Sequence, residues 1–162
     1  MTSNSSLQHA RDRLAILYTL HEYCRLGDCW DAQSQADWPA TVAPDLVIRY
    51  GALGEYRGRE AFFRMCDDYH KRWKAMQHIC HSPRVELDGD EATVITPHIA
   101  VHVPLDGGPV VQAGTTWLHR MRRIDGAWVI AEAAVEFVWS DHPEIIPGKA
   151  WSETRARNAG AE

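Results

Sequence analysis

The first half of the chain begins with a helical pattern of apolar residues. From about residue 6 to residue 26 they recur at three- and four-residue spacings, as in an amphipathic helix. Ser5 or Ser6 suits the N-cap, and Gly27 suits the C-terminal end because glycine readily adopts left-handed backbone angles. We therefore predict a first helix over residues 6–26.

A second amphipathic stretch covers residues 59–76. Its large apolar side chains gather on one side: Phe62, Phe63, Met65, Cys66, Tyr69 and Trp73. Between the two helices the pattern predicts a short helix over about 36–42 that stops near Pro44, a strand over 46–51, and a turn with a short returning strand over 52–58. The first half is thus predicted to be mainly helical.

The second half predicts strands joined by tight turns. Three Asp-Gly turns separate four apolar or β-branched runs, at residues 77–88, 91–105, 109–124 and 127–139. Asp-Gly between two such runs is a strong hairpin signal, so an antiparallel meander is expected. Helices first and strands second indicate an α+β fold with the helices packed on one face of a sheet.

Length and charge narrow the possibilities further. The 162 residues suit a single domain over residues 1–162, with a core of about 8–143 between a polar N-terminal arm and a polar C-terminal tail from residue 147. The net charge of −5, without a basic stripe, argues against a nucleic-acid partner.

The chain also lacks the marks of a membrane or secreted protein. No apolar run approaches the roughly 18 residues that span a bilayer, and the N-terminus has no apolar signal core. No CxxC pair or disulfide framework is formed by the four cysteines, Cys24, Cys29, Cys66 and Cys80. We therefore predict no membrane partner and a cytoplasmic location.

Several short motifs follow one another in an order that resembles a known family. They are Ile16, Tyr23 and Asp28 at spacings of seven and five, then Asp37-Trp38, Tyr56-Arg57-Gly58, Gln77-His78, Arg84 to Glu86, and a closing hairpin of a basic strand, an Asp-Gly turn and a Trp-containing strand. Over about residues 8–143 the chain resembles the SnoaL-like, scytalone dehydratase-like branch of the nuclear transport factor 2-like superfamily. The resemblance implies a cone-shaped α+β barrel, in which a curved mixed, mainly antiparallel sheet wraps around N-terminal helices and leaves one deep pocket.

Two segments resemble scytalone dehydratase more closely. One is Ala43 to Leu46, followed by Ile48 and Tyr50, and the other is Met76 to His78. The second histidine of that family falls on His102, on the following strand.

The chain departs from the family pattern in two places. Trp117 stands where the family has a pocket asparagine. The loop after Asp28 is longer than usual, so the carboxylate that pairs with His78 is either Asp28 or Asp31.

The residues that the resemblance points to suit an elimination. Removing water from a β-hydroxy carbonyl compound needs a base, a stabiliser of the enolate oxygen and an acid, and needs no cofactor when the site is dry and pre-organised. His78 is the predicted base, since histidine titrates near neutral pH, and Asp28 would orient it. Tyr23 and Tyr50 would polarise the carbonyl, and His102 would protonate the departing hydroxyl or hold the substrate.

These residues also have a purely structural interpretation. Asp28 would then cap a turn, and His78 would be a hydrogen-bonded core histidine. Tyr23 and Tyr50 would be core residues with their hydroxyls at the rim.

His98 and His102 share one face of the predicted strand 91–105. The alternation of a strand places them with Ala92, Val94, Thr96 and Ala100, whereas the opposite face is more apolar. The histidine face is therefore either solvated or a pocket wall of mixed polarity.

A metal site is conceivable among nine histidines, with His78, His81, His98 and His102 as ligands. Residues i and i+4 of a strand lie more than about 10 Å apart, however, so one zinc ion cannot easily take both strand histidines. We predict no metal and no cofactor. Cys80, near His78, is interpreted as a small core residue rather than a nucleophile.

The many aromatic residues predict an apolar ligand, such as an aromatic or polycyclic compound. The expected substrate-binding residues are Trp38, Phe63, His98, Trp117, Glu136 and Trp139. Glu136 would add an ionisable group if it points inward, and would belong to a solvated face with Glu132 otherwise.

The resemblance implies a cofactor-independent lyase, first of all a dehydratase acting on a small hydrophobic hydroxy-carbonyl compound. An isomerase, a cyclase or a dehydrohalogenase would use the same pocket. The alternative of another class is a non-catalytic binding or assembly subunit, like the β subunits of ring-hydroxylating dioxygenases. A homo-oligomer is expected, with a trimer favoured over a dimer.

Overall fold

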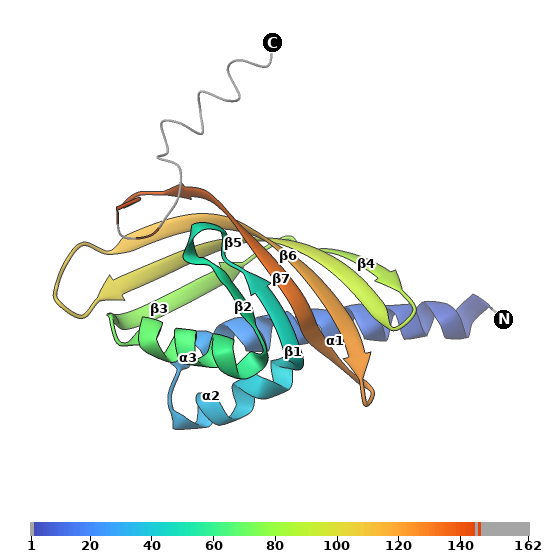
Figure 1. Cartoon of the computed structure of the whole chain (residues 1–162). Coiled ribbons are helices and arrows are strands. Elements are labelled where there is room, and N and C mark those ends of the chain that lie inside the picture. The colour runs from blue at the N-terminus through green and yellow to red at the C-terminus, as the bar shows by residue number, and fades with distance from the viewer. Residues whose placement is uncertain (1, 145, 147–162) are drawn as a thin grey trace, which may run out of the picture.

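The computed structural model describes residues 2–144 and residue 146; the predicted polar tail from residue 147 lies outside them. Figure 1 shows the arrangement of the elements. In chain order they are α1 (Thr2–Cys29), α2 (Ala32–Asp37), η1 (Trp38–Thr41), β1 (Val42–Arg49), η2 (Gly51–Leu53), β2 (Glu55–Arg57), α3 (Arg59–His70), β3 (Trp73–Cys80), β4 (Arg84–Asp88), β5 (Glu91–Pro104), β6 (Val111–Ile124) and β7 (Ala127–Ser140). No described helix is both long and apolar enough to cross a bilayer.

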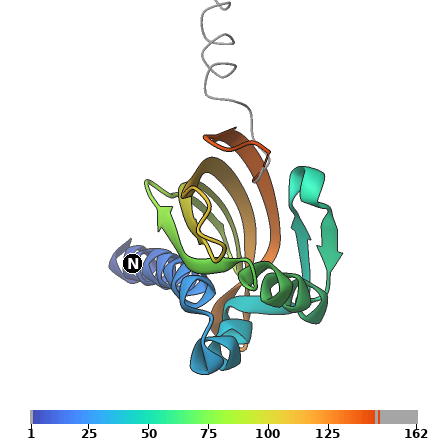
Figure 2. The same ribbon diagram turned by 90° about the vertical axis from the view of Figure 1, so that its left-hand side faces the viewer.

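The seven strands form one curved sheet. Its order is β2-β1-β7-β6-β5-β3, and β4 pairs with β5 as well. Every pairing is antiparallel except that of β1 with β7, which is parallel. The helices lie on the concave side, and the sheet does not close on itself (Figures 1 and 2). The predicted α+β fold, with a curved and mainly antiparallel sheet around N-terminal helices, is confirmed.

The predicted strand over residues 77–88 is in fact two strands, β3 and β4. Both pair with the same edge of β5, β4 with its first residues and β3 with its last. Between them Ser82 has a φ of 46°, and Pro83 has no amide hydrogen, so neither continues a regular strand. Strands β4 and β3 therefore follow one another along this edge of β5. The change from one to the other lies where the amide of His81 donates to the carbonyl of Pro97.

The helix boundaries differ from the predicted ones. Helix α1 begins at Thr2 and runs past Gly27 to Cys29, so the predicted serine caps lie inside it. Helix α3 ends at His70 rather than at residue 76. The segment from Trp73 onward pairs with β5 instead, and this long-range pairing overrides the local helical pattern.

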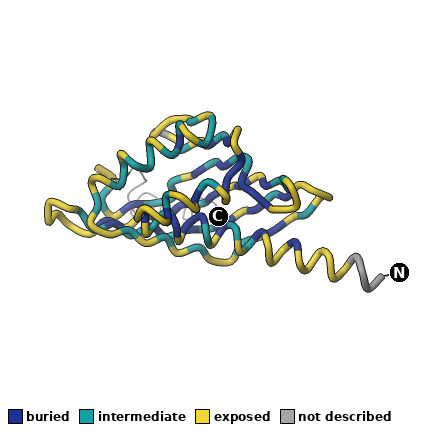
Figure 3. The backbone as a smooth tube through the Cα atoms, turned by 90° about the horizontal axis from the view of Figure 1, so that it is seen from below, coloured by how far each residue is buried: buried dark blue, intermediate teal, exposed yellow. Residues whose placement is uncertain are grey.

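The buried face of α1 matches the predicted apolar pattern only in part. Leu7, Leu14 and Tyr18 are exposed. The side chains that face the sheet include Ile16, Leu20, Tyr23, Cys24 and Leu26. The N-terminal part of α1 extends beyond the sheet, as Figure 3 shows. Leu14 and Tyr18 are exposed for another reason, since they stand on the side of the helix that faces away from the buried Ile16.

Strand β5 shows how the interior is built. Its even-numbered residues from Ala92 to His102 are buried, and its odd-numbered residues are at least partly accessible. The face that carries His98 and His102 is therefore the inner face of the sheet, which is turned toward the helices. This alternation aims both histidines at the space between the sheet and α1 and α3.

Candidate active site

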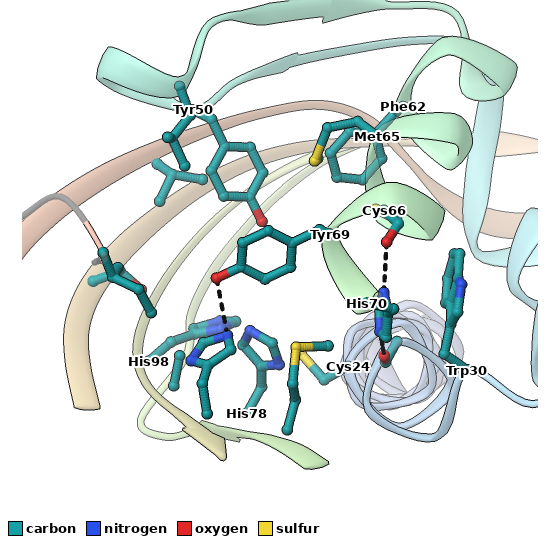
Figure 4. A pocket seen from close by; sticks show the side chains of 18 of the residues that line it. Cys24, Trp30, Tyr50, Phe62, Met65, Cys66, Tyr69, His70, His78 and His98 are labelled. Atoms are coloured by element: carbon teal, nitrogen blue, oxygen red, sulfur yellow. Dashed lines mark hydrogen bonds between the residues drawn. The ribbon is translucent and has the colours of Figure 1, made fainter. Parts of the chain in front are cut away.

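A cavity of about 590 Å³ lies between the helices and the inner face of the sheet. Figure 4 shows several of the side chains that line it. Aromatic residues from all parts of the chain form much of its wall, namely Tyr23, Trp30, Trp38, Tyr50, Phe62, Tyr69, Trp117 and Phe137. A cavity of this size and apolarity suits a small hydrophobic molecule.

His78 and Asp28 form the most defined polar pair in this cavity. The imidazole Nδ1 lies 2.6 Å from Oδ1 of Asp28, and the other carboxylate oxygen accepts the backbone N–H of His78 at 2.8 Å. Because an ionised carboxylate only accepts hydrogen bonds, Nδ1 carries the hydrogen and Nε2 is left as a base. The predicted contact between the two side chains is present.

The two elements that carry this pair explain its geometry. Asp28 lies in the last turn of α1, and His78 lies on β3, which is an edge strand. The amide of His78 is therefore not taken by a further strand, and the carboxylate uses it as a second anchor. Asp31, the alternative partner, instead caps α2 by accepting the amide of Ser34 at 2.7 Å.

His102 lies beside this pair but in a drier place. Its ring centre is 5.9 Å from that of His78, and its Nε2 is 3.3 Å from the hydroxyl of Tyr69. Burial, and to a lesser degree the nearby His78, lowers the pKa of His102 to about 3. At neutral pH it is therefore an uncharged imidazole, which acts as a hydrogen-bond partner and not as a strong acid.

Tyr69 is a polar member of the site that the sequence interpretation treated only as part of an apolar stripe. Burial raises the pKa of its phenol to about 12, so the hydroxyl stays protonated. The sequence contained a signal for Tyr69 as a cavity residue, namely its helical spacing from Phe62 and Cys66, which places all three on the same face of α3.

Tyr23 and Tyr50 both line the cavity, as predicted. Burial is the largest cause that raises the pKa of both phenols well above the usual value of 10. Trp117 packs against both rings, with centroids at 6.1 Å and 5.3 Å. Both hydroxyls therefore remain protonated and can only donate, accept or share a hydrogen bond, without becoming phenolates.

Trp117 is the centre of a stack of three rings on the sheet. The imidazoles of His98 and His119 lie against it, with centroids at 5.2 Å and 5.4 Å. The indole N–H is taken by the hydroxyl of Thr115 at 3.0 Å, so Trp117 offers the cavity mainly its apolar surface. The polar contact of the family asparagine has no counterpart at this position.

His119 is fully buried, and within the described part of the chain neither of its ring nitrogens has a hydrogen-bond partner. Burial lowers its pKa to about 3. An unfolded histidine titrates near about 6.5, so the unfolded chain binds the proton more readily between these two values. Stability should therefore fall as the pH drops below about 6.5, and should be insensitive to this group above it.

We expect His119→Leu to flatten this acid dependence. The slope that the substitution removes approaches about 1.4 kcal/mol per pH unit for one fully titrating group. Urea unfolding of the two proteins at pH 7 and pH 5 measures it. An unchanged difference in unfolding free energy between the two pH values would show that His119 is not protonated on unfolding.

Three predicted substrate-binding residues are not among the residues that line the cavity. Phe63 packs against Trp30, with ring centroids 5.0 Å apart, while its neighbour Phe62 faces the cavity. Successive residues of a helix point about a quarter turn apart, so Phe62 and Phe63, which both belong to the predicted apolar stripe, face different surroundings. Glu136 is exposed, because Val135 and Phe137 on either side of it point inward. Neither side chain therefore lies in the wall of the cavity.

Trp139 is not among the lining residues either. In the pairing with β6, Thr115 lies opposite Phe137 but Gly114 lies opposite Trp139, so Val138 is an extra residue. This bulge reverses the alternation after Phe137 and turns Trp139 to the convex face. There its indole covers Gly114, where an added Cβ would lie 2.0 Å from the indole nitrogen.

His70 joins two helix ends at the cavity. Its Nδ1 lies 2.6 Å from the carbonyl oxygen of Cys66, its Nε2 lies 2.6 Å from that of Gly27, and its ring stacks on Trp30 at 4.5 Å. Carbonyl oxygens only accept, so each of these contacts is a hydrogen bond when the ring nitrogen that faces the oxygen carries a hydrogen. This contact was not foreseen from the sequence.

We expect His70→Ala to lower the free energy of unfolding by about 1–3 kcal/mol, because two carbonyl groups lose their partner. Guanidinium unfolding of the variant measures this loss. His21→Ala, at an exposed position of α1, is the matched control and should change stability little. Equal losses in the two variants would contradict a joining role for His70.

Only one group of three possible metal ligands gathers within the described residues, namely Cys24, Cys80 and His98. Their ligand atoms lie within 4.8 Å of one another. The histidine set considered from the sequence does not form such a group there.

Comparison with known proteins places this fold and site in context. The SnoaL-like domain matches residues 8–134. A search of curated proteins found no significant match.

Several solved structures are similar in fold. Hexachlorocyclohexane dehydrochlorinase (LinA) Type2 is 14% identical, with a TM-score of 0.76 over 83% of this chain and 90% of that one. A protein assigned as a scytalone dehydratase from Novosphingobium aromaticivorans is 17% identical, with a TM-score of 0.75 over 86% and 90%. LinA-type3 from Novosphingobium barchaimii is 16% identical, with a TM-score of 0.75 over 83% and 92%.

At these identities the structures establish a shared fold only. The family assignment rests on the sequence match, which covers more than half of the chain. The chain therefore belongs to the SnoaL-like domain family.

Proposed function

We propose that this protein is a cofactor-independent lyase of the dehydratase type, acting on a small hydrophobic hydroxy-carbonyl compound. The observation that carries the proposal is the His78–Asp28 pair, with 2.6 Å between Nδ1 and Oδ1, at the wall of a largely aromatic cavity. The names of two structural neighbours denote eliminations, of hydrogen chloride and of water, which supports the reaction class.

The first step would be removal of the proton next to the carbonyl. Nε2 of His78 takes this proton, and Asp28 holds the ring and stabilises the imidazolium that forms. The carbonyl oxygen gains negative charge at the same time. The protonated hydroxyls of Tyr23 and Tyr50 are the candidate donors to it.

The second step would be departure of the hydroxyl group. The imidazolium of His78 returns the proton to the leaving oxygen, so that water is released and the base is regenerated. His102 and Tyr69 stand on the same side of the cavity, and their hydrogen-bonding groups can hold that oxygen while the C–O bond breaks. A neutral His102 suits this holding role, and it replaces the predicted role as acid.

Elimination of a halide is the second candidate, and one observation favours it. Chloride needs no proton to leave, and the histidine beside the base is neutral at ordinary pH because burial lowers its pKa to about 3. An isomerase or cyclase would share the first step. A non-catalytic assembly subunit is less well supported, since a cavity of about 590 Å³ remains open. The homo-oligomer, with a trimer favoured, stays a prediction.

Proton exchange tests the step that all the catalytic candidates share. A panel of β-hydroxy ketones and chlorinated cyclic compounds is incubated with the protein in D2O, and deuterium at the carbon next to the carbonyl or halide carbon is measured by NMR. We expect His78-dependent exchange, together with release of water or chloride from at least one compound. Compounds that bind in the cavity without exchange or release would contradict a lyase and favour a binding protein.

A further inference from the structure

Two cysteines meet at the base of the cavity, next to the proposed acid–base pair. Cys24 comes from α1 and Cys80 from β3, and their sulfur atoms are 3.1 Å apart. Cys24 itself lines the cavity, so a small reagent that enters the cavity reaches the pair. Figure 4 shows Cys24 beside the ring of His78.

The two cysteines lie on the same two elements as Asp28 and His78. Cys24 lies one helical turn before Asp28, and Cys80 lies two residues after His78 on the same face of β3. The contact between α1 and β3 is thus bridged at two neighbouring points, once by the hydrogen bonds of Asp28 with His78 and once by the two cysteines.

The two thiols differ in their acidity. The hydrogen bond with Cys24, followed by contacts with His98, lowers the pKa of Cys80 to about 5. The Nδ1 of His98 lies 3.8 Å from the Cys80 sulfur. The same hydrogen bond, together with burial, raises the pKa of Cys24 well above its usual value. Cys80 is therefore the more acidic of the two thiols, and the 3.1 Å between the sulfur atoms places Cys24 where it can resolve an oxidised Cys80.

The other two cysteines serve as internal references. Cys29 is exposed at the end of α1. Burial raises the pKa of Cys66 to about 12, so that thiol stays protonated and unreactive. Within the described part of the chain, neither of them pairs with another sulfur as Cys80 does.

We propose that Cys24 and Cys80 form an oxidisable dithiol site, which hydrogen peroxide converts to a disulfide between α1 and β3. The Cys80 thiolate attacks one peroxide oxygen, the O–O bond breaks, and hydroxide leaves to give a sulfenic acid at Cys80. The Cys24 sulfur then attacks the Cys80 sulfur, the S–O bond breaks, and the hydroxyl group leaves with the Cys24 proton as water. Two thiols lose two electrons in total, and one peroxide is reduced to two waters.

The geometry requires little rearrangement for this closure. A disulfide bond is about 2.05 Å long, so the two sulfur atoms must approach by only about 1 Å. The disulfide bond would link the helix that carries Asp28 to the strand that carries His78. The inference does not depend on the reaction that the site catalyses.

Peroxide titration of the full, reduced chain tests the proposal by mass spectrometry. We expect an intact mass lower by two hydrogen atoms, and a non-reduced peptide map that joins the peptides of Cys24 and Cys80. Cys24→Ser should stop at the sulfenic acid of Cys80, with a mass higher by one oxygen atom and trapping by dimedone. Cys29→Ser and Cys66→Ser are the matched controls and should form the same disulfide as the wild type.

Differential alkylation of the wild-type chain keeps the test valid if a serine variant fails to fold, as judged by circular dichroism. Peroxide should protect Cys24 and Cys80 together from later alkylation before it affects Cys66. Two results would overturn the proposal. One is that both cysteines remain alkylatable after Cys29 has been oxidised. The other is that they are shielded by a bound zinc or copper ion until a chelator is added, which would assign Cys24, Cys80 and His98 to a metal site instead.

Discussion

His78→Ala should lower the turnover number for the proposed elimination by a factor of about 10²–10⁴, the range that one general base contributes. The alanine variant keeps the aromatic wall of the cavity but has no group that accepts the substrate proton. KM should change much less than kcat, because the apolar walls that bind the substrate are intact. Steady-state kinetics with the compound selected by the exchange experiment measures both constants.

The control for this variant is His81→Ala. His81 lies three residues further along, is exposed, and is not among the residues that line the cavity. It should turn over at the wild-type rate. Deuterium exchange at the substrate carbon should disappear in the His78 variant only. If exchange persists in His78→Ala with a folded protein, another group removes the proton and the proposed mechanism fails.

Asp28→Asn should also lower kcat by a factor of about 10²–10⁴, with a smaller effect on KM. Asp28 uses both carboxylate oxygens as acceptors, one for Nδ1 and one for the amide of His78. Asparagine has only one acceptor oxygen, and its amide nitrogen would face a donor. The ring of His78 then loses either its orientation or the tautomer that leaves Nε2 free.

Asp31→Asn separates this effect from a general loss of stability. Asp31 carries the same charge three residues later but only caps α2, where asparagine is also a good cap. It should leave kcat unchanged. Unfolding in urea accompanies both variants, so that a loss of kcat in a stable Asp28→Asn protein is assigned to the site. Equal kinetics in the two variants would remove Asp28 from the mechanism.

Much of the architecture follows from local patterns in the chain. The Asp-Gly dipeptides mark the turns from β4 to β5, from β5 to β6 and from β6 to β7. A turn can be predicted in this way because it depends on adjacent residues. The alternation along β5 places His98 and His102 on one face with small and apolar residues, and the structure buries that face. The family motifs added the contact of His78 with Asp28, which the structure contains at 2.6 Å.

The errors have one physical origin, which is that pairing between distant segments overrides local periodicity. The stripe over residues 59–76 is helical in pattern, but β5 recruits Trp73 onward into a strand. An extra residue at Val138 reverses the direction of Trp139, and no local pattern reveals such a bulge. Phe62 and Phe63 are equally apolar, and only the docking angle of α3 decides which one faces the cavity.

By itself, the sequence determined the class of the fold, the turns between the last strands and the set of residues that share one face of β5, and its motifs pointed to a contact of His78 with Asp28 or Asp31. These features depend on residues that are close together in the chain, or on short motifs that follow one another in the order typical of the family. The tertiary structure alone decided which aromatic rings line the cavity, that Tyr69 reaches His102, and that Cys24 meets Cys80. Those contacts join residues on separate elements, and they depend on strand register and on how the helices dock, which a local pattern of side chains does not encode.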